Sequence, residues 1–341
     1  MCLYPTMMKN RKYVANGKNG GIIPSVPDER VLYVSVGCQQ CVECRKQKAR
    51  NWQVRIMEDI KVNKNGKFVT FTFSDESIKN LAGELSDKLE GYELDNEIAT
   101  LAMRRFLERW RKKYKKSLRH WVVTELGHNG TQNIHMHGIV WTDESMDEVE
   151  KIWNYGFVWK GKEKNGQLIN YVNEKTINYI VKYVHKVDEE HLYYKSKVLT
   201  SKGIGSNYLI TFDSKRNQYK GTTTDTAYKT RQGYKLALPT YYRNKLYSDE
   251  QRERLWLDML DKNERWVCGE RIDVSKGLDE YYKTVDYYRV RNAELGYGTG
   301  EKDWSRQQYE QELRNAKILE RIERAQKKTD KEKETFSLKE T

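Results

Sequence analysis

The stretch NIHMHGIVW, from Asn133 to Trp141, restricts the fold of this chain more than any other segment. Its mostly apolar residues predict a largely buried β-strand. His135 and His137 are two positions apart, so both imidazoles project from one face of that strand. Paired imidazoles are suited to a metal ion, whereas the alternative is two histidines that pack as polar sheet residues. Gly138 leaves space beside them for another group to approach closely.

The composition predicts a globular protein with a polyanionic partner. Of the 341 residues, 38% are hydrophobic and 33% are charged. The chain contains no run of about 18 apolar residues and no signal-peptide pattern. We therefore expect one large domain or two smaller ones, no membrane span, and a location in the cytoplasm. The formal net charge of +13 favours nucleic acid as the partner.

The densest basic block lies between Arg104 and Arg119. Apolar residues recur in it at spacings of three and four, which predicts an amphipathic helix with a basic outer face. This face either contacts phosphates or is simply solvated. The segment before the block, residues 75–97, is acidic and is predicted to be a loop.

Three of the five cysteines form the pattern Cys38-x-x-Cys41-x-x-Cys44. Disulfides are not expected in the cytoplasm, and structural Zn²⁺ requires four thiolate or imidazole ligands. Cys2 is the expected fourth ligand, and Cys268 is a distant substitute. An iron-sulfur cluster is not expected, because Lys and Ala stand where that motif needs Cys and Pro. The alternative to zinc is a set of free thiols at the start of a helix.

Two further strands are predicted beside the histidine strand. Residues 66–74 (GKFVTFTFS) alternate their side chains, and residues 120–126 (HWVVTEL) are rich in β-formers. Residues 127–132 (GHNGTQ) have the composition of a turn. The strand over 120–126 therefore pairs with the histidine strand as an antiparallel hairpin.

That hairpin brings a carboxylate to the histidines. Glu125 lies on the first arm, where its side chain meets His135 and His137 across the pair. Two nitrogens and one carboxylate leave positions open for water and phosphate oxygens. This mixture favours catalytic Mg²⁺ or Mn²⁺ over a closed structural site.

The segment from Thr176 to Val187 (TINYIVKYVHKV) predicts an amphipathic helix. Tyr179 and Tyr183 lie on one side, together with Lys182 and Lys186. Because the tyrosines are four positions apart, their phenols project from adjacent turns. The opposite side is the predicted core face, formed by Ile177, Ile180, Val181 and Val184.

Tyrosines beside a metal site suit attack on a phosphodiester. A phenol with a pKa of about 10 is a poor nucleophile at neutral pH and needs help. A cation at the Glu125 site would polarise the scissile phosphate, and Lys182 would stabilise the developing charge. The product would be a 5′-phosphotyrosine link and a free 3′-OH. The chain has no G-x-x-x-x-G-K-[ST] run, in agreement with a reaction that hydrolyses no nucleotide.

The order of these motifs resembles the HUH endonucleases, which initiate rolling-circle replication. The motifs are the strand FVTFTFS, the strand HMHGIVW and the helix with YIVKY. The two-tyrosine helix is similar to that of the replication initiators of gokushovirus-type microviruses. So are MCLYP at the start, GCQQCVECRKQKARNW, and LALPTYYRNKLYS from Leu236 to Ser248. The resemblance covers roughly residues 1 to 250.

This resemblance implies a metal-dependent DNA endonuclease and strand transferase that nicks one strand at an origin and later rejoins it. The implied fold is α+β and ferredoxin-like, with flanking helices and a central antiparallel sheet that has the metal-site strand in its middle and the tyrosine helix across its edge. The implied partners are single-stranded origin DNA, viral replicative-form DNA, and the replication helicase and polymerase of a bacterial host, in whose cytoplasm the protein would act. Carried over position by position, the resemblance implies two metal ligands, a less constant third ligand, two candidate nucleophiles and an assisting lysine, namely His135, His137, Glu125, Tyr179, Tyr183 and Lys182.

The predicted organisation has four parts. The tyrosines of residues 195–250 either stack on bases of single-stranded DNA or form a core. From Trp304 to Lys333 the chain is charged at almost every position, which predicts an extended, partly disordered helix that contacts another protein. The parts are a Cys-rich segment over 1–50, an HUH endonuclease domain over 51–210, a basic and aromatic region over 211–300, and a charged helical or disordered tail over 301–341.

Three other functions compete with this one. A plasmid relaxase or single-strand transposase would keep the metal and the tyrosines, but the Cys-rich start argues against it. A histidine-triad hydrolase needs His-x-His-x-His, and Ile139 occupies the third position. A zinc-stabilised nucleic-acid-binding protein without activity would tolerate Tyr179→Phe together with Tyr183→Phe, whereas a nickase would not.

Overall fold

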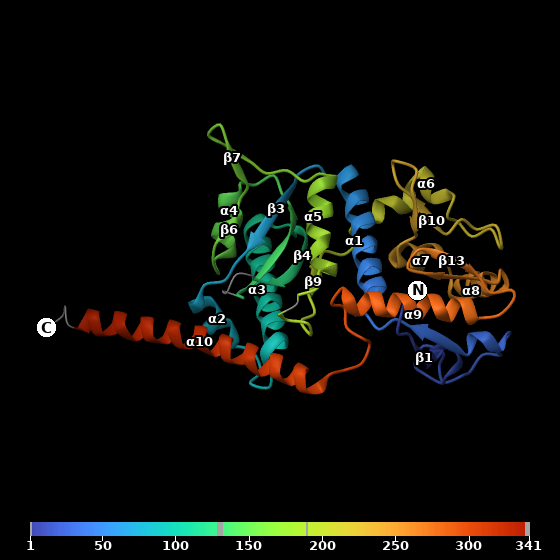
Figure 1. Cartoon of the computed structure of the whole chain (residues 1–341). Helices are drawn as coiled ribbons and strands as arrows, with labels where there is room; N and C mark the ends of the chain where they lie inside the picture. The colour runs from blue at the N-terminus through green and yellow to red at the C-terminus, as the bar shows by residue number, and fades with distance from the viewer. Residues whose placement is uncertain (1, 128–131, 189, 338–341) are drawn as a thin grey trace. The chain divides into compact units, whose positions relative to one another are not determined.

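The computed structural model describes residues 2–127, 132–188 and 190–337, which fall into two compact units (Figure 1). Residues 128–131 of the predicted turn lie outside the described residues. The cysteine unit contains Met1–Glu58, His185–Glu189 and Gly205–Glu301. The sheet unit contains Asp59–Val184, Glu190–Ile204 and Lys302–Thr341. Helix α1 (Val42–Val62) contributes residues to both units.

A five-stranded sheet organises the sheet unit, and every pair of neighbouring strands is antiparallel. Strand β5 carries both histidines and is the middle strand, as predicted. The α+β class with a central antiparallel sheet and flanking helices is thereby confirmed. In spatial order the strands are β6 (Val158–Trp159), β3 (Gly66–Phe71), β5 (Ile134–Trp141), β4 (Arg119–Leu126) and β9 (Val198–Thr200).

Strand β5 lies between β3 and β4, which run in the same direction as each other. The chain passes from β3 through two helices to β4, leaving a gap in the sheet that the next strand fills. This is the arrangement of a split β-α-β unit. As a result, β5 is hydrogen-bonded along both of its edges.

The two faces of the sheet differ in character because side chains alternate along each strand. One face is apolar and packs on helices; it includes Val69, Phe71, Met136 and Val140. Ser74 caps the first of these helices by accepting from the backbone N–H of Ser77. The helices are α2 (Asp75–Ala82), α3 (Gly91–Tyr114) and α4 (Met146–Trp153). The opposite face carries the histidines.

The acidic segment over 75–97 was predicted as a loop, and that prediction was wrong. It forms α2 and the first turns of α3. Asp75 and Glu76 occupy the first turn of α2, where negative charge favours a helix. The predicted basic helix is the last part of α3, which ends at Tyr114 because Lys115 adopts a left-handed conformation with φ of 55°.

The charged C-terminal segment forms α10 (Trp304–Ser337), which runs along α2 and α3 in Figure 1. Ile318 is 1% exposed and belongs to the main core of the sheet unit. Ile322 packs against that core while remaining partly exposed. The weak apolar stripe of this segment is therefore a contact surface within the sheet unit.

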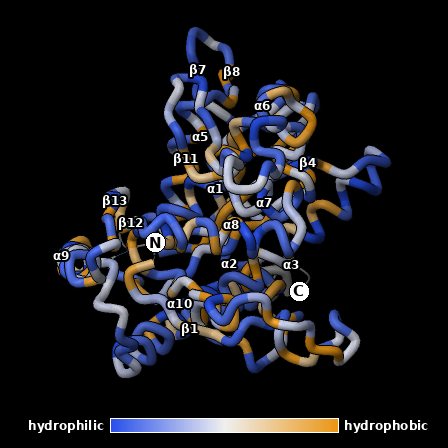
Figure 2. Tube along the Cα trace, turned by 90° about the vertical axis from the view of Figure 1, so that its right-hand side faces the viewer, coloured by the Kyte–Doolittle hydropathy of each residue, from blue (hydrophilic) through white to orange (hydrophobic). Residues whose placement is uncertain are grey.

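The β7–β8 hairpin joins β6 to the tyrosine helix α5 (Glu174–His185). Every residue of its strands, Lys162–Lys164 and Gln167–Ile169, is exposed. Figure 2 shows this hairpin coloured mostly as hydrophilic. Asn170 anchors its base by bonding both the N–H and the carbonyl of Phe68, at 2.8 Å each.

The cysteine unit combines short hairpins with helices. A first hairpin, β1 with β2, precedes the cysteine pattern, and α1 follows that pattern. The hairpins are β1 (Thr6–Lys9) with β2 (Tyr33–Val36), β10 (Ala227–Lys229) with β11 (Lys235–Ala237), and β12 (Glu264–Val267) with β13 (Glu270–Asp273). The α-helices after α1 are α6 (Phe212–Lys215), α7 (Thr240–Leu246), α8 (Asp249–Asp261) and α9 (Asp279–Glu294).

Hydrophilic positions interrupt the hydrophobic ones along the helices (Figure 2). Within the described part of the chain, no helix combines the length and the apolar character needed to cross a membrane.

Candidate metal and tyrosine site

The β4–β5 hairpin brings Glu125, His135 and His137 together. Glu125 is the register partner of His135. Its Oε2 lies 3.3 Å from Nε2 of His135 and 3.0 Å from Nε2 of His137. The two Nε2 atoms are 3.0 Å apart. The predicted meeting of the carboxylate and the imidazoles across the hairpin is therefore present in the structure.

The other ring nitrogen of each histidine is held by its surroundings. Nδ1 of His135 lies 3.0 Å from the carbonyl oxygen of Asn133. Nδ1 of His137 lies 2.9 Å from Oγ1 of Thr70 on β3. A carbonyl can only accept, so Nδ1 of His135 carries the proton and its Nε2 has a free lone pair. Such partners orient imidazoles for metal binding.

The carboxyl group of Glu125 is ionised in this setting. Burial alone would raise its pKa, but hydrogen bonds with His135 and His137 lower it from 4.5 to about 2. The group therefore presents a negative charge to the two imidazoles at any pH near neutrality.

The three ligand atoms fit an octahedral ion. Two ligands about 2.1 Å from an ion and at right angles to each other are roughly 3.0 Å apart. The three separations here are 3.0, 3.0 and 3.3 Å. Glu125, His135 and His137 would thus occupy one face of the coordination sphere. Three positions would remain for water or phosphate oxygens, which suits a catalytic Mg²⁺ or Mn²⁺.

Helix α5 places both tyrosines beside these ligands. Asn173 accepts from the backbone N–H of Thr176 at 3.0 Å and so caps the start of the helix. The ring of Tyr183 stacks on His137, with centroids 4.3 Å apart and planes at 12°. The hydroxyl of Tyr183 donates to that of Tyr179 at 2.6 Å. The predicted core face of the helix is buried at all four positions, Ile177, Ile180, Val181 and Val184.

The two tyrosines have different environments. Burial, the hydrogen bond with Tyr179 and the charge of Glu125 raise the pKa of Tyr183 well above its usual range. Tyr179 is 50% exposed and contacts Phe68 of β3 edge-on, with centroids 6.1 Å apart. Lys182 is exposed, and among the described residues no hydrogen bond or ion pair joins it to the histidines or the tyrosines.

Two supporting residues were not predicted as part of the site. Thr70 orients His137, and Phe68 contacts both His137 and Tyr179. The sequence carried a signal for them, because the alternation of β3 puts Phe68 and Thr70 on one face. What it could not show is that β3 pairs Thr70 directly with His137.

The cysteine unit holds a second cluster, formed by Cys2, Cys38, Cys41 and Cys44, whose sulfurs all lie within 4.8 Å of one another. The sulfurs of Cys2 and Cys41 are 3.9 Å apart. Sulfurs about 2.3 Å from a tetrahedral Zn²⁺ lie roughly 3.8 Å apart, so this separation fits zinc. This four-cysteine group can bind a structural metal.

Backbone N–H groups point at these sulfurs, as expected for thiolates. The sulfur of Cys2 accepts from the N–H of Cys38 at 3.2 Å, and that of Cys38 accepts from the N–H of Cys41 at 3.3 Å. Cys268 is partly buried in the same apolar cluster but lies outside the four-cysteine group. Between the two candidates for a fourth ligand, the structure brings in Cys2.

The tyrosines of the segment over 195–250 mainly form a core in the cysteine unit. The rings of Tyr208 and Tyr242 are 4.7 Å apart. The hydroxyl of Tyr242 donates to the carbonyl of Gly205 at 2.9 Å. The buried members are Tyr208, Tyr228, Tyr242 and Tyr247. Of the two interpretations of this segment, these four residues support packing.

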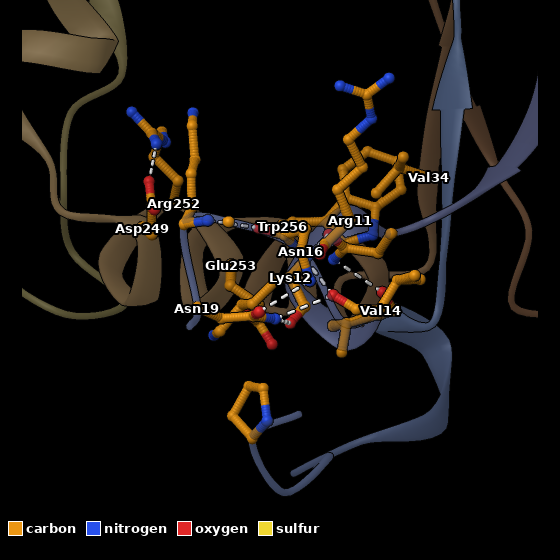
Figure 3. Close-up of a pocket in the computed structure, with 15 residues that line it drawn as sticks. Arg11, Lys12, Val14, Asn16, Asn19, Val34, Asp249, Arg252, Glu253 and Trp256 are labelled. Atoms are coloured by element: carbon orange, nitrogen blue, oxygen red, sulfur yellow. Dashed lines mark hydrogen bonds and ion pairs between the residues drawn. The ribbon is translucent and has the colours of Figure 1, made fainter. Parts of the chain in front are cut away.

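A hollow of about 910 Å³ lies in the cysteine unit, between the start of the chain and α8 (Figure 3). Lys12 pairs with Glu253, and Arg252 pairs with Asp249. The side chain of Asn16 donates to the carbonyl of Val14 at 2.7 Å. None of the predicted site residues lines this hollow. Its internal pairs stabilise the loop, so we assign it no catalytic role.

Comparison with known families covers the segment that holds the metal and tyrosine site. Residues 66–188 match a family of replication-associated proteins, the ORF2 family. The match supports a viral replication-associated protein, and it spans all three ligands and both tyrosines. No curated protein matches the chain. No solved structure matches it either.

Proposed function

We propose that this protein initiates rolling-circle replication as an endonuclease of the HUH type, by nicking one DNA strand through a tyrosine. The observation that carries the proposal is the joining of two features. The convergent Glu125, His135 and His137 touch a tyrosine pair directly, through the stacking of Tyr183 on His137. A pair of histidines that served only as sheet residues would need neither the carboxylate nor the phenols.

Glu125, His135 and His137 would hold Mg²⁺ or Mn²⁺, which would polarise the scissile phosphate and position it for in-line attack. A tyrosine oxygen attacks phosphorus as the bond to the 3′-oxygen breaks. The leaving oxygen takes a proton and becomes a 3′-OH, while the tyrosine keeps the 5′-phosphate. Attack of a 3′-OH on this link reverses the step and rejoins the strand.

Tyr179 is the better candidate for the first attack. It is the more exposed of the two phenols, and it accepts the hydrogen bond that Tyr183 donates. A donor aimed at the attacking oxygen stabilises the phenolate there. Tyr183 would then accept the second cleavage while the first strand end is still attached. Lys182 would assist only by moving toward the phosphate, since it is exposed and unbound in the described structure.

The substrates we propose are single-stranded origin DNA and viral replicative-form DNA, and the source is a gokushovirus-type microvirus. The free 3′-OH would serve the polymerase of a bacterial host, and a host helicase would open the duplex. The reaction would take place in the cytoplasm of that host. The net charge of +13 supports a polyanionic substrate.

The test is a covalent adduct on labelled single-stranded origin DNA, resolved on a denaturing gel in the presence of Mn²⁺. The adduct is expected to vanish with EDTA, with His135→Ala, and with Tyr179→Phe combined with Tyr183→Phe. Tyr171→Phe is the matched control, because Tyr171 is an exposed tyrosine outside α5. Tight binding with no adduct under any metal would replace the nickase by a zinc-stabilised binding protein.

A further inference from the structure

Helix α10 contacts the loop that carries the metal ligands. The loop between β4 and β5 returns to the sheet through Gln132 and Asn133, just before His135. Arg314 of α10 donates from Nη1 to the carbonyl oxygen of Gln132 at 2.7 Å. Lys317, one turn further on, donates to the side-chain oxygen of the same glutamine.

Arg314 is itself rigidly held. Its side chain is 2% exposed, and its guanidinium makes two parallel bonds to Asp95 of α3, at 2.5 and 2.8 Å. A two-point contact of this kind fixes the direction of the guanidinium plane. The remaining nitrogen therefore points at the Gln132 carbonyl with little freedom.

Gln132 needs such support because its backbone is strained. It has a φ of 45°, a conformation that residues with a Cβ rarely adopt. Its side-chain nitrogen donates to Glu190 at 2.6 Å. The backbone carbonyl, the amide oxygen and the amide nitrogen of this one residue are thus all bonded, two of them to α10.

Asn133 connects this contact to the metal site. Its carbonyl accepts from the backbone N–H of Gly127 at 3.0 Å, which closes the hairpin. The same carbonyl lies 3.0 Å from Nδ1 of His135. The orientation of the His135 imidazole depends on this carbonyl, and the carbonyl follows directly after the residue that Arg314 holds.

We propose that Arg314 and Lys317 are positioning residues for the metal site, which makes α10 part of the catalytic domain. They hold Gln132 so that the Asn133 carbonyl orients His135 toward Glu125. This inference rests on the metal site of the proposed function. Changes in the partners of metal-bound histidines typically weaken metal affinity about 10- to 100-fold, and Arg314→Gln is expected to fall in that range.

The experiment compares Arg314→Gln with Arg321→Gln in the full chain. Arg321 is a matched control one heptad further along α10: its side chain is 6% exposed, and it bonds Asp75 at 2.6 Å and the carbonyl of Phe73 at 2.9 Å. Mn²⁺ affinity is measured by titration with detection of free Mn²⁺ by electron paramagnetic resonance. We expect weaker binding in Arg314→Gln and unchanged binding in Arg321→Gln. Equal affinities in both variants and the wild type would overturn the proposal.

Lys317→Met keeps the test decisive if Arg314→Gln fails to fold. It removes the contact to Gln132 and leaves the ion pair of Arg314 with Asp95 intact. It is expected to weaken Mn²⁺ binding by a smaller factor, and Lys328→Met, at a largely exposed position of α10, is its control. Unchanged affinity in Lys317→Met would remove Lys317 from the positioning role.

A metal-free measurement separates this inference from the proposed function. In Arg314→Gln, the backbone amides of β4 and β5 next to the loop should exchange hydrogen faster than in Arg321→Gln. If the wild type binds no Mn²⁺, the metal site of the proposed function is wrong, and the exchange rates still decide the positioning of the hairpin. Equal exchange in the two variants would refute that positioning.

Discussion

The ring of Tyr183 lies parallel to the imidazole of His137, with centroids 4.3 Å apart. This contact joins the helix that carries the proposed nucleophiles to the strand that carries the proposed ligands. The hydroxyl of Tyr183 then reaches Tyr179. A sequence of three aromatic side chains thus leads from the metal ligands to the exposed surface of α5.

The two tyrosines should differ when changed singly. Tyr179→Phe removes the proposed first nucleophile and should abolish the adduct with single-stranded DNA. Tyr183→Phe removes a hydrogen bond to the attacking oxygen, and the adduct should form about tenfold more slowly, since such a bond contributes about 1.4 kcal/mol. Quenched-flow kinetics of adduct formation would measure both. The reverse pattern would assign the first attack to Tyr183.

Glu125 should make stability depend on acid in the metal-free protein. Its pKa is lowered from 4.5 to about 2 on folding, so the folded state binds fewer protons. Its stabilising contribution is complete above the unfolded pKa and is lost as the pH falls toward 2. The contribution is at most about 3 kcal/mol. Urea unfolding of the wild type and of Glu125→Gln should show a difference that shrinks below about pH 4.5. A difference that is constant with pH would contradict the assignment.

The four-cysteine group should hold zinc independently of the catalytic metal. Cys41→Ser is expected to lose the zinc that the wild type carries and to unfold the cysteine unit at a lower temperature, because such sites contribute folding energy. Cys268→Ser is the control, since Cys268 lies outside the group. Elemental analysis of the purified proteins and thermal unfolding would provide the measurements. Equal zinc content in the wild type and Cys41→Ser would exclude the site.

Gly138 should tolerate no side chain. A Cβ at this position would lie 2.2 Å from the carbonyl oxygen of Trp121 and 2.6 Å from Cα of Val122, both on β4. Neither atom can move without disturbing the sheet. Gly138→Ala should destabilise the protein by about 2 kcal/mol or more. Gly17→Ala is the control, because a Cβ there meets nothing within 4 Å. Chemical denaturation of both variants measures the difference.

The sequence predicted the centre of the sheet unit well because its signals are local. Alternation in β3, β4 and β5 indicates which residues share a face, and a hairpin brings Glu125 to His135 without further information. The periodicity of α5 separated its apolar side from its tyrosines in the same way. Gly138 was correctly interpreted as a close approach, and the approaching group is strand β4.

Other features depend on contacts that no local pattern reveals. Arg314 is buried because Asp95, 219 positions earlier, receives it. A sequence window sees only a charged residue in a charged helix and predicts exposure. The helix over 75–82 was missed although Ser74, Asp75 and Glu76 together form a helix-start signal. Acidic composition alone was therefore a poor guide to a loop in that segment.

The position of β5 between two partner strands has a consequence for how the site can fail. A slip of one residue in its pairing would turn every side chain to the opposite face and place both histidines among the apolar residues that pack on α3. Burying two imidazoles there without partners is costly, so misaligned pairings are selected against as the sheet forms. The ligands are therefore assembled all at once, in the step that aligns the three central strands, and a folded sheet with a half-built site is not an accessible state.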